Sequence, residues 1–156
     1  MWAKTPIFSA LTTRERSRVY LLDTNVISEA RKREKANSGV RKFFRKVSRS
    51  DTEVYLSVVT VGELRRGVEL VRHRGDSAQA DLLETWLQTV LSGYAQNILS
   101  VDEEIGQVWG RLRVPHAEHV LDKLIAATAL IHDLTVVTRN IDDFAGTGVR
   151  LLNPFE

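Results

Sequence analysis

Three acidic residues lie next to apolar segments, at places where helices are expected to begin. Asp23 follows the apolar run at 19–22, Glu63 lies near the start of another expected helix, and Asp122 precedes the apolar segment 124–131. An acid in the first turn of a helix caps free N–H groups and is stabilised by the helix dipole. Each acid therefore has an ordinary structural explanation when it is taken alone.

A metal site explains the three acids better when they are taken together. In an open parallel sheet, ligands bind in the crevice at the carboxyl ends of the strands, and Asp23 follows such an end. Glu63 lies one turn into the helix after another strand. Converging carboxylates repel one another, and a divalent cation relieves that repulsion. Mg²⁺ held by carboxylates can activate a water and stabilise the charge of an attack on phosphorus.

Other polar residues have competing explanations. The spacing Thr60-x-x-Glu63 is that of a capping box, and Asp102 is best explained as a helix cap. His116-x-x-His119, with Asp122 three residues later, has the spacing of a possible zinc site. Contact of these histidines with a phosphate-bearing substrate at the rim of a cleft is the favoured interpretation.

Charge and cysteine content narrow the chemistry. The chain has 156 residues and no cysteine, so a metal here must use oxygen or imidazole ligands. The formal net charge is only +2, yet the stretch 31–49 holds nine basic residues against the single acid Glu34. Such a cluster attracts polyanions, although a solvated helix face is the alternative. The predicted RNA contacts in it are Arg31, Arg33, Lys42 and Arg45.

These residues need a scaffold, and the apolar pattern predicts one. The expected strands are 19–22, 54–58, 98–101, 134–138 and 149–152. The expected helices are one after Asp23 and those at 40–47, 60–74, 78–91, 102–114 and 119–132. Strands that alternate with helices and are continuously apolar predict a parallel sheet covered on both faces.

The pattern also predicts how the chain is organised. We expect one α/β domain over 19–156 and an N-terminal extension at 1–18, for which a disordered tail is the favoured interpretation. No apolar stretch approaches the roughly 18 residues of a membrane span, which predicts a cytoplasmic protein without a membrane partner.

Four segments resemble the PIN-domain toxins of the VapC type. They are LLDTNVIS (21–28), SVVTVGELRRGV (57–68), DKLIAATALIHDLTVVTRNIDDF (122–144) and GVRLLNPF (148–155). The resemblance implies a three-layer α/β/α sandwich with a four- to five-stranded parallel sheet. It further implies a Mg²⁺- or Mn²⁺-dependent endoribonuclease, held inactive by a cognate antitoxin, and a homodimer.

The same resemblance implies roles for individual residues. Asp23, Glu63 and Asp122 take the three main acidic positions of the family. The fourth is either Asn140, where some members have an acid, or Asp143, the acid of the Asp-Phe pair, which we favour. The polar positions expected around the site are Asn140, Thr24 and Asn25. In one respect this chain departs from the family, since 22 residues precede its first aspartate.

Two other functions are compatible with these residues. The chain could be a non-catalytic partner in an autoregulatory complex that contacts DNA only through the antitoxin, with an antitoxin arginine in the acidic cleft. It could also be a PIN-type DNA nuclease, although the chain leaves little room for the extra helices of such enzymes. The apolar stripes at 60–71 and 82–90 belong either to a dimer interface or to the core.

Overall fold

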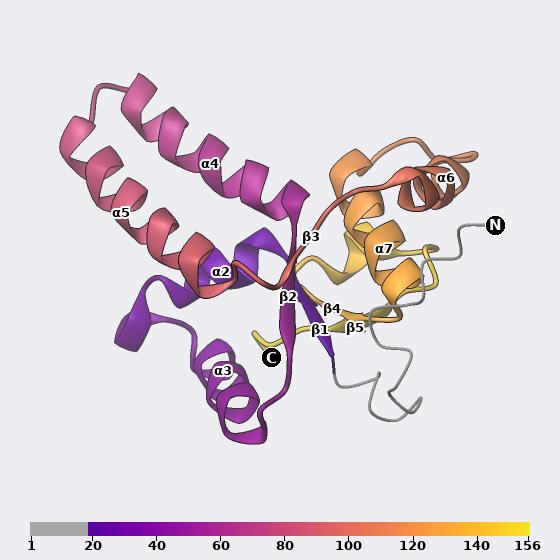
Figure 1. Cartoon of the computed structure of the whole chain (residues 1–156), viewed down its shortest axis with the longest axis horizontal. Coiled ribbons are helices and arrows are strands. Elements are labelled where there is room, and N and C mark those ends of the chain that lie inside the picture. The colour runs from indigo at the N-terminus through magenta and orange to yellow at the C-terminus, as the bar shows by residue number, and fades with distance from the viewer. Residues whose placement is uncertain (1–18) are drawn as a thin grey trace.

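A five-stranded parallel sheet forms the centre of the computed structural model, which describes residues 19–156 (Figure 1). The strand order is β3-β2-β1-β4-β5, so β1 is the central strand, and every pair is parallel. The strands are β1 (Tyr20–Leu22), β2 (Val54–Ser57), β3 (Ile98–Leu99), β4 (Thr135–Val137) and β5 (Arg150–Leu152). The predicted extension at 1–18 lies outside the described residues.

Helices cover both faces of this sheet, as predicted. They are α2 (Thr24–Ala30), α3 (Ser38–Ser50), α4 (Val58–His73), α5 (Ser77–Gly93), α6 (Glu103–Leu112) and α7 (Val120–His132), with short 3₁₀ turns η1 (Arg33–Lys35) and η2 (Ile141–Phe144). Figure 1 shows α2 to α5 on one side of the strands and α6 and α7 on the other. Between residues 19 and 156, no helix has the length and apolar character needed to cross a membrane.

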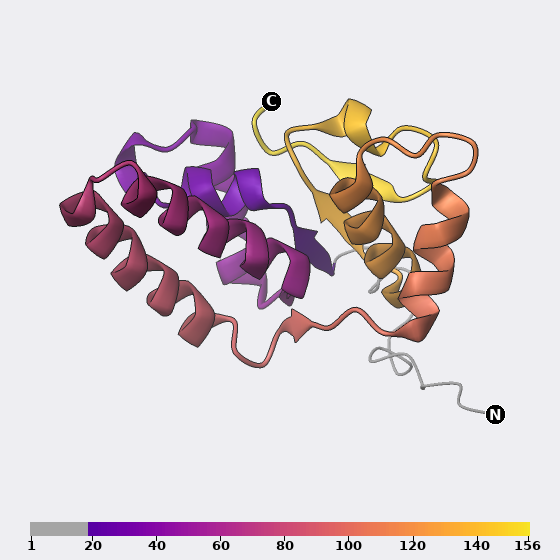
Figure 2. The ribbon, with the colours of Figure 1, turned by 90° about the horizontal axis from the view of Figure 1, so that it is seen from above.

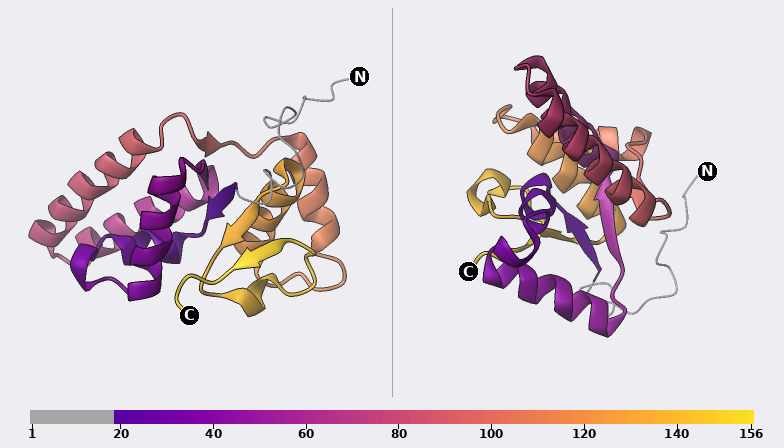
Figure 3. Two further views of the ribbon diagram at one scale, coloured as in Figure 1. Left: turned by 90° about the horizontal axis from the view of Figure 1, so that it is seen from below. Right: turned by 90° about the vertical axis from the view of Figure 1, so that its left-hand side faces the viewer.

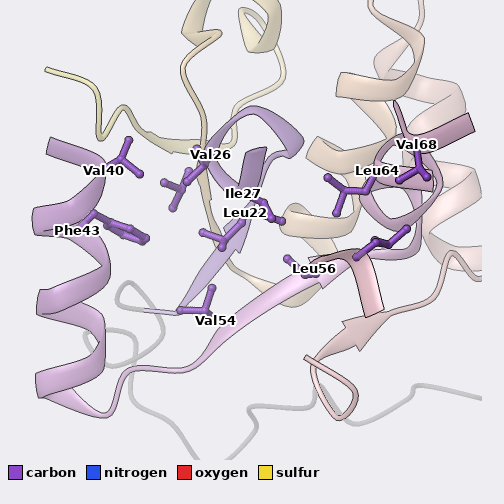
Figure 4. Close-up of a cluster of buried hydrophobic side chains, with 11 residues drawn as sticks. Leu22, Val26, Ile27, Val40, Phe43, Val54, Leu56, Leu64 and Val68 are labelled. Carbon is purple, nitrogen blue, oxygen red and sulfur yellow. The ribbon is translucent and has the colours of Figure 1, made fainter. Parts of the chain in front are cut away.

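The two faces of the sheet bury separate sets of side chains because neighbouring residues of a strand point to opposite faces. On β1, Leu21 packs toward α7 while Leu22 packs toward α2 to α5. The first cluster includes Tyr55, Ile125, Ala126, Ala129, Val136 and Phe144. The second, drawn in Figure 4, includes Val26, Ile27, Val40, Phe43, Val54, Leu56, Leu64 and Val68. The sheet is thus held rigidly between two apolar layers.

The residues that cap the helices explain why two helices begin earlier in the chain than the sequence pattern predicted. Helix α4 begins at Val58, because the Ser57 side chain accepts a hydrogen bond from the Val59 N–H at 3.1 Å. The capping box predicted at Thr60 is therefore wrong, and Thr60 lies buried inside the first turn. Asn37 caps α3, which is longer than the apolar stripe at 40–47 suggested. Asp102 caps α6 as predicted.

Helices α4 and α5 form an antiparallel hairpin that extends away from the sheet (Figures 2 and 3). Their predicted apolar stripes pack mainly into the core, because Val68 and Leu87 are fully buried there. Leu82 is the exception, with 68% of its surface exposed. On the outer side, Arg65 places its two terminal nitrogens 2.5 and 2.8 Å from the Glu84 carboxylate and ties the helices together. The stripes are thus largely core.

Candidate metal centre

Asp23 lies at the carboxyl edge of the sheet, immediately after the central strand. Its backbone N–H donates to the Val137 carbonyl at 2.9 Å, which places it between the ends of β1 and β4. The residue is only 5% exposed. As the N-cap of α2, its Oδ1 accepts a hydrogen bond from the Thr24 N–H at 2.8 Å. Thr24 thus contacts Asp23 through its backbone N–H.

The second carboxylate oxygen of Asp23 is held by side chains. Oδ2 accepts hydrogen bonds from Thr138 Oγ1 at 2.8 Å and from Asn25 Nδ2 at 3.1 Å. The Asn25 carbonyl oxygen in turn accepts from the Arg139 N–H at 3.1 Å, so Asn25 joins α2 to the loop after β4. Burial raises the pKa of Asp23, and the hydrogen bonds from Thr138, Thr24 and Asn25 oppose that rise.

The structure brings Glu63 and Asp122 to the same cavity as Asp23. Asp122 lies in the first turn of α7, and Glu63 lies in the second turn of α4, two helices that contact each other. The cavity has a volume of about 520 Å³, and its lining includes Asp23, Thr24, Asn25, Glu63, His119, Asp122 and Asn140. Burial raises the pKa of Asp122 to about 6, and the negative charges of Asp23 and Asp143 add to the rise.

Asp143 comes from η2 and lies close to Asp122. Ligand atoms of His119, Asp122 and Asp143 all lie within 4.8 Å of one another. Asn140 is exposed and lines the cavity, its backbone N–H donates to Thr138 Oγ1 at 3.0 Å, and its carbonyl accepts from the Asp143 N–H at 3.1 Å. Asp142 is exposed. Asp143 thus shares a cluster of ligand atoms with Asp122, whereas Asn140 lines the cavity of Asp23.

The donor set fits a hard divalent cation. Carboxylates from four different parts of the chain come near one another, and the charges of Asp23, Asp143 and Glu63 add to the rise in the pKa of Asp122 that burial mainly causes. The buried amine nearest to them in sequence, that of Lys123, donates instead to the His116 carbonyl. Clustered carboxylate oxygens are the environment that Mg²⁺ and Mn²⁺ take.

The zinc arrangement considered for the two histidines is not formed. His116 is 77% exposed at its side chain, and its Nδ1 lies 3.6 Å from Glu118 rather than near Asp122. His119 alone reaches the acidic cluster, with Nδ1 at 3.5 Å from Asp143 Oδ1. The sequence spacing was misleading because Pro115 and the turn after it separate His116 from α7.

The basic residues predicted to contact RNA lie away from the acidic cavity. Arg33 and Arg45 line a separate hollow of about 330 Å³ beside α3, and Arg31 lies over the Trp86 ring, 5.8 Å from its centre. Lys42 is exposed on α3. None of the four lines the cavity of Asp23.

Sequence reasoning missed two residues at the end of β4. Thr138 is fully buried and holds Asp23, while Arg139 lines a hollow of about 620 Å³ together with Asn140 and Asp143. The Arg139 guanidinium lies 5.0 Å from the centre of the Phe155 ring. The available signal was the polar run Thr-Arg-Asn directly after an apolar strand.

Comparison with known proteins gives a consistent family. The family model described as the PIN domain matches residues 20–149 of this chain. Toxin FitB of Neisseria gonorrhoeae is 37% identical over 140 residues, which cover 86% of this chain and 97% of FitB. The VapC ribonuclease Y4jK of Sinorhizobium fredii is 30% identical over 142 residues, covering 87% of this chain and 97% of the relative.

Solved structures agree with the sequence relatives. The crystal structure of FitAcB from Neisseria gonorrhoeae superposes with a TM-score of 0.75 at 36% identity, covering 88% of this chain and 99% of that one. A structure of FitAB bound to an IR36 DNA fragment superposes with a TM-score of 0.70 at 34% identity, covering 88% and 96%.

Proposed function

Because this chain belongs to the PIN-domain family, we propose that it is a divalent-metal-dependent endoribonuclease, the toxin of a toxin–antitoxin pair. The observation that carries the proposal is the convergence of Asp23, Glu63, Asp122 and Asp143 at one edge of the sheet. Relatives named as ribonucleases and as a toxin support it. The carboxylates alone suit Mg²⁺, the ion expected from the sequence, and Mn²⁺ is compatible with the same ligands.

Asp23 and Asp122 would hold the metal directly, and Glu63 with Asp143 would complete its surroundings or orient the attacking water. When bound, the ion would activate water and offset the charge that develops on the phosphate. Asp23 is suited to this role because Thr138 and Asn25 fix its carboxylate before any ligand arrives. Since water rather than the ribose 2′-hydroxyl attacks, the expected products carry a 5′-phosphate and a 3′-hydroxyl.

The Asp23→Asn variant tests the enzyme. The neutral amide keeps the size of the side chain but loses the charge, so we expect cleavage of RNA in Mg²⁺ or Mn²⁺ to fall by about 100-fold or more. Circular dichroism should show an unchanged fold. Asp51→Asn, at an exposed site at the end of α3, is the control and should cleave normally. Wild-type activity of purified Asp23→Asn would overturn the proposal.

A pair of neighbouring variants tests the fourth position. Asp143 belongs to the acidic cluster while Asp142 is exposed, so Asp143→Asn should lose most cleavage and Asp142→Asn should retain it. Asn140→Ala should have the smaller effect, since its amide carries no charge. Equal activity of the Asp143→Asn and Asp142→Asn variants would remove Asp143 from the proposed site.

A second role is proposed for the complex with the antitoxin. The similarity to FitAB, whose structure contains a DNA fragment, favours an assembly in which the antitoxin binds DNA and this chain contacts it indirectly. Gel-shift assays with promoter DNA should show binding by the complex and none by this chain alone. If binding were its only role, partner-free protein with Mn²⁺ would leave every RNA intact.

Matched oligonucleotides separate the ribonuclease from a DNA nuclease. A ribonuclease should cleave single-stranded RNA and spare DNA of the same sequence under the same metal conditions. Faster cleavage of DNA would favour the PIN-type DNA nuclease instead. We also propose a homodimer, which sedimentation of the free chain would test, with Leu82→Glu probing the exposed part of α5.

A further inference from the structure

His119 is the residue before α7, yet its side chain makes no capping hydrogen bond to the helix. Its backbone is left-handed, with φ 55° and ψ 47°, a conformation that non-glycine residues adopt uncommonly and in which histidine, asparagine and aspartate are enriched. The helix end therefore makes no use of the imidazole.

The left-handed backbone places the imidazole at the acidic cluster. His119 lines the cavity that contains Asp23 and Glu63, and its Nδ1 lies 3.5 Å from Asp143 Oδ1. His119 and Asp122 are three residues apart, a spacing that puts two side chains on the same side of a helix start. A ligand atom of each of the three lies within 4.8 Å of the other two.

The separation fits two ligands of one ion better than a direct pair. At 3.5 Å the nitrogen and oxygen are too far apart for a strong hydrogen bond. The His119 side chain is 46% exposed, so an ion pair with Asp143 would add little. Donors about 2.1 Å from a shared ion are separated by roughly 3–4 Å, and a small adjustment of the three side chains reaches that range.

We infer that His119 donates an imidazole nitrogen to the proposed metal site and makes it selective for Mn²⁺ over Mg²⁺. Imidazole is a ligand of transition-metal ions, whereas Mg²⁺ keeps to oxygen donors and water. The inference rests on the proposed function, because the other ligands are the carboxylates proposed there. It adds a nitrogen donor and a choice of metal to that site.

Pulsed electron paramagnetic resonance of the full chain with Mn²⁺ tests the inference without measuring activity. Wild type should show coupling of the bound Mn²⁺ to a ¹⁴N nucleus. His119→Asn is the test variant, because asparagine tolerates the left-handed backbone and lacks the imidazole. It should lose the nitrogen coupling and bind Mn²⁺ about tenfold or more weakly, with Mg²⁺ affinity changed by less than about threefold. His116→Asn is the matched control and should match wild type in both respects.

The outcomes separate the two proposals. If wild type binds Mn²⁺ without coupling to ¹⁴N, or if His119→Asn weakens Mn²⁺ and Mg²⁺ binding equally, His119 is not a selective ligand and the inference is wrong, while the carboxylate site stands. If wild type binds neither ion, the metal-dependent function falls together with the inference. Circular dichroism confirms the fold of each variant. In His119→Gly, which also fits the backbone, added imidazole should restore Mn²⁺ affinity.

Discussion

Thr138 and Asp23 are 115 residues apart in sequence, and the hydroxyl of Thr138 donates a 2.8 Å hydrogen bond to the Asp23 carboxylate. The bond links the ends of β1 and β4, which are adjacent in the sheet. Thr138 Oγ1 also accepts from the Asn140 N–H, so one buried hydroxyl holds both an acid and the loop beside it. A residue that contacts no predicted ligand other than Asp23 thus orients the proposed site.

Replacing Thr138 separates orientation from charge. Thr138→Val keeps the shape but removes the donor to Asp23, so we expect metal affinity and cleavage rate to fall by about 10- to 100-fold. Thr138→Ser keeps the hydroxyl and should stay near wild type. Calorimetric titration with Mn²⁺ and a cleavage assay at fixed metal measure the two effects. Equal losses in the valine and serine variants would argue for packing rather than the hydrogen bond.

The stability of the metal-free protein should depend on the protonation of Asp122. Its pKa is about 6 in the folded protein and near 3.8 in the unfolded chain, so the folded state binds the proton more tightly. As pH rises between these values, the unfolded state has already lost its proton, and the free energy of unfolding falls. Above about pH 6 the free energy of unfolding has fallen by the full amount, and below about pH 4 this loss is absent.

Asp122→Asn should remove this dependence. At pH 7.5 without metal, the variant is expected to be more stable than wild type by roughly 1–2 kcal/mol, after allowance for partial solvent screening, and equally stable near pH 4. Thermal unfolding at the two pH values measures the difference. Saturating Mn²⁺ should reduce this difference in stability, because the ion stabilises the wild type, which binds it, and not the variant that has lost a ligand. A gap of the same size at both pH values would contradict the role assigned to Asp122.

Two glycines in helices should respond in opposite ways to alanine. A Cβ at Gly39, in the first turn of α3, would collide with the backbone carbonyl of Pro154, so Gly39→Ala should cost about 1–3 kcal/mol. A Cβ at Gly67 on α4 meets nothing within 4 Å, so Gly67→Ala should gain about 0.5–1 kcal/mol from helix propensity. Urea denaturation gives both values, and a neutral Gly39→Ala would show that the chain after β5 moves easily.

Basic residues near and far from the site should affect RNA in different ways. Arg139 lines a hollow with Asp143, so Arg139→Gln should weaken RNA binding and slow cleavage at saturating RNA. Arg45→Gln, on α3, should weaken binding alone. Each change should reduce the slope of log affinity against log salt concentration by about the amount expected for one phosphate contact. Filter binding in the Asp23→Asn background measures the affinity for RNA. If Arg45→Gln also slowed cleavage at saturating RNA, the bound RNA would have to lie differently from the position expected here.

Local signals predicted most of the elements but not the contacts between them. The apolar run of β4 and the burial of α7 were readable because short stretches carry their own periodicity. The cap at Ser57 was missed because Thr60, three residues after the end of β2, begins a sequence pattern typical of a capping box. Thr138 and His119 contact acids that lie far away in the sequence, Asp23 and Asp143. The polar run after β4 and the spacing of His119 from Asp122 could not specify these two contacts.

The predicted acidic and basic residues show the same difference between what a local pattern indicates and what the tertiary structure decides. Asp23 and Asp122 could be recognised from their place beside apolar elements, and the structure brings both to one cavity. The basic cluster at 31–49 was equally conspicuous, yet α2 carries its first member away from Asp23 and α3 carries others to a different hollow. Charge alone indicates the kind of partner, whereas the direction of a helix decides where that partner meets the protein.

The central place of β1 has a consequence for a chain growing on the ribosome. The first strand synthesised in the domain pairs on one side with β2, but its other neighbour, β4, is made more than a hundred residues later. Until then Asp23 has neither Thr138 nor Asp122 beside it. The acidic centre of the nascent chain therefore stays incomplete through most of translation. A nuclease with this fold would be unable to cleave the messenger RNA that encodes it until synthesis is nearly complete.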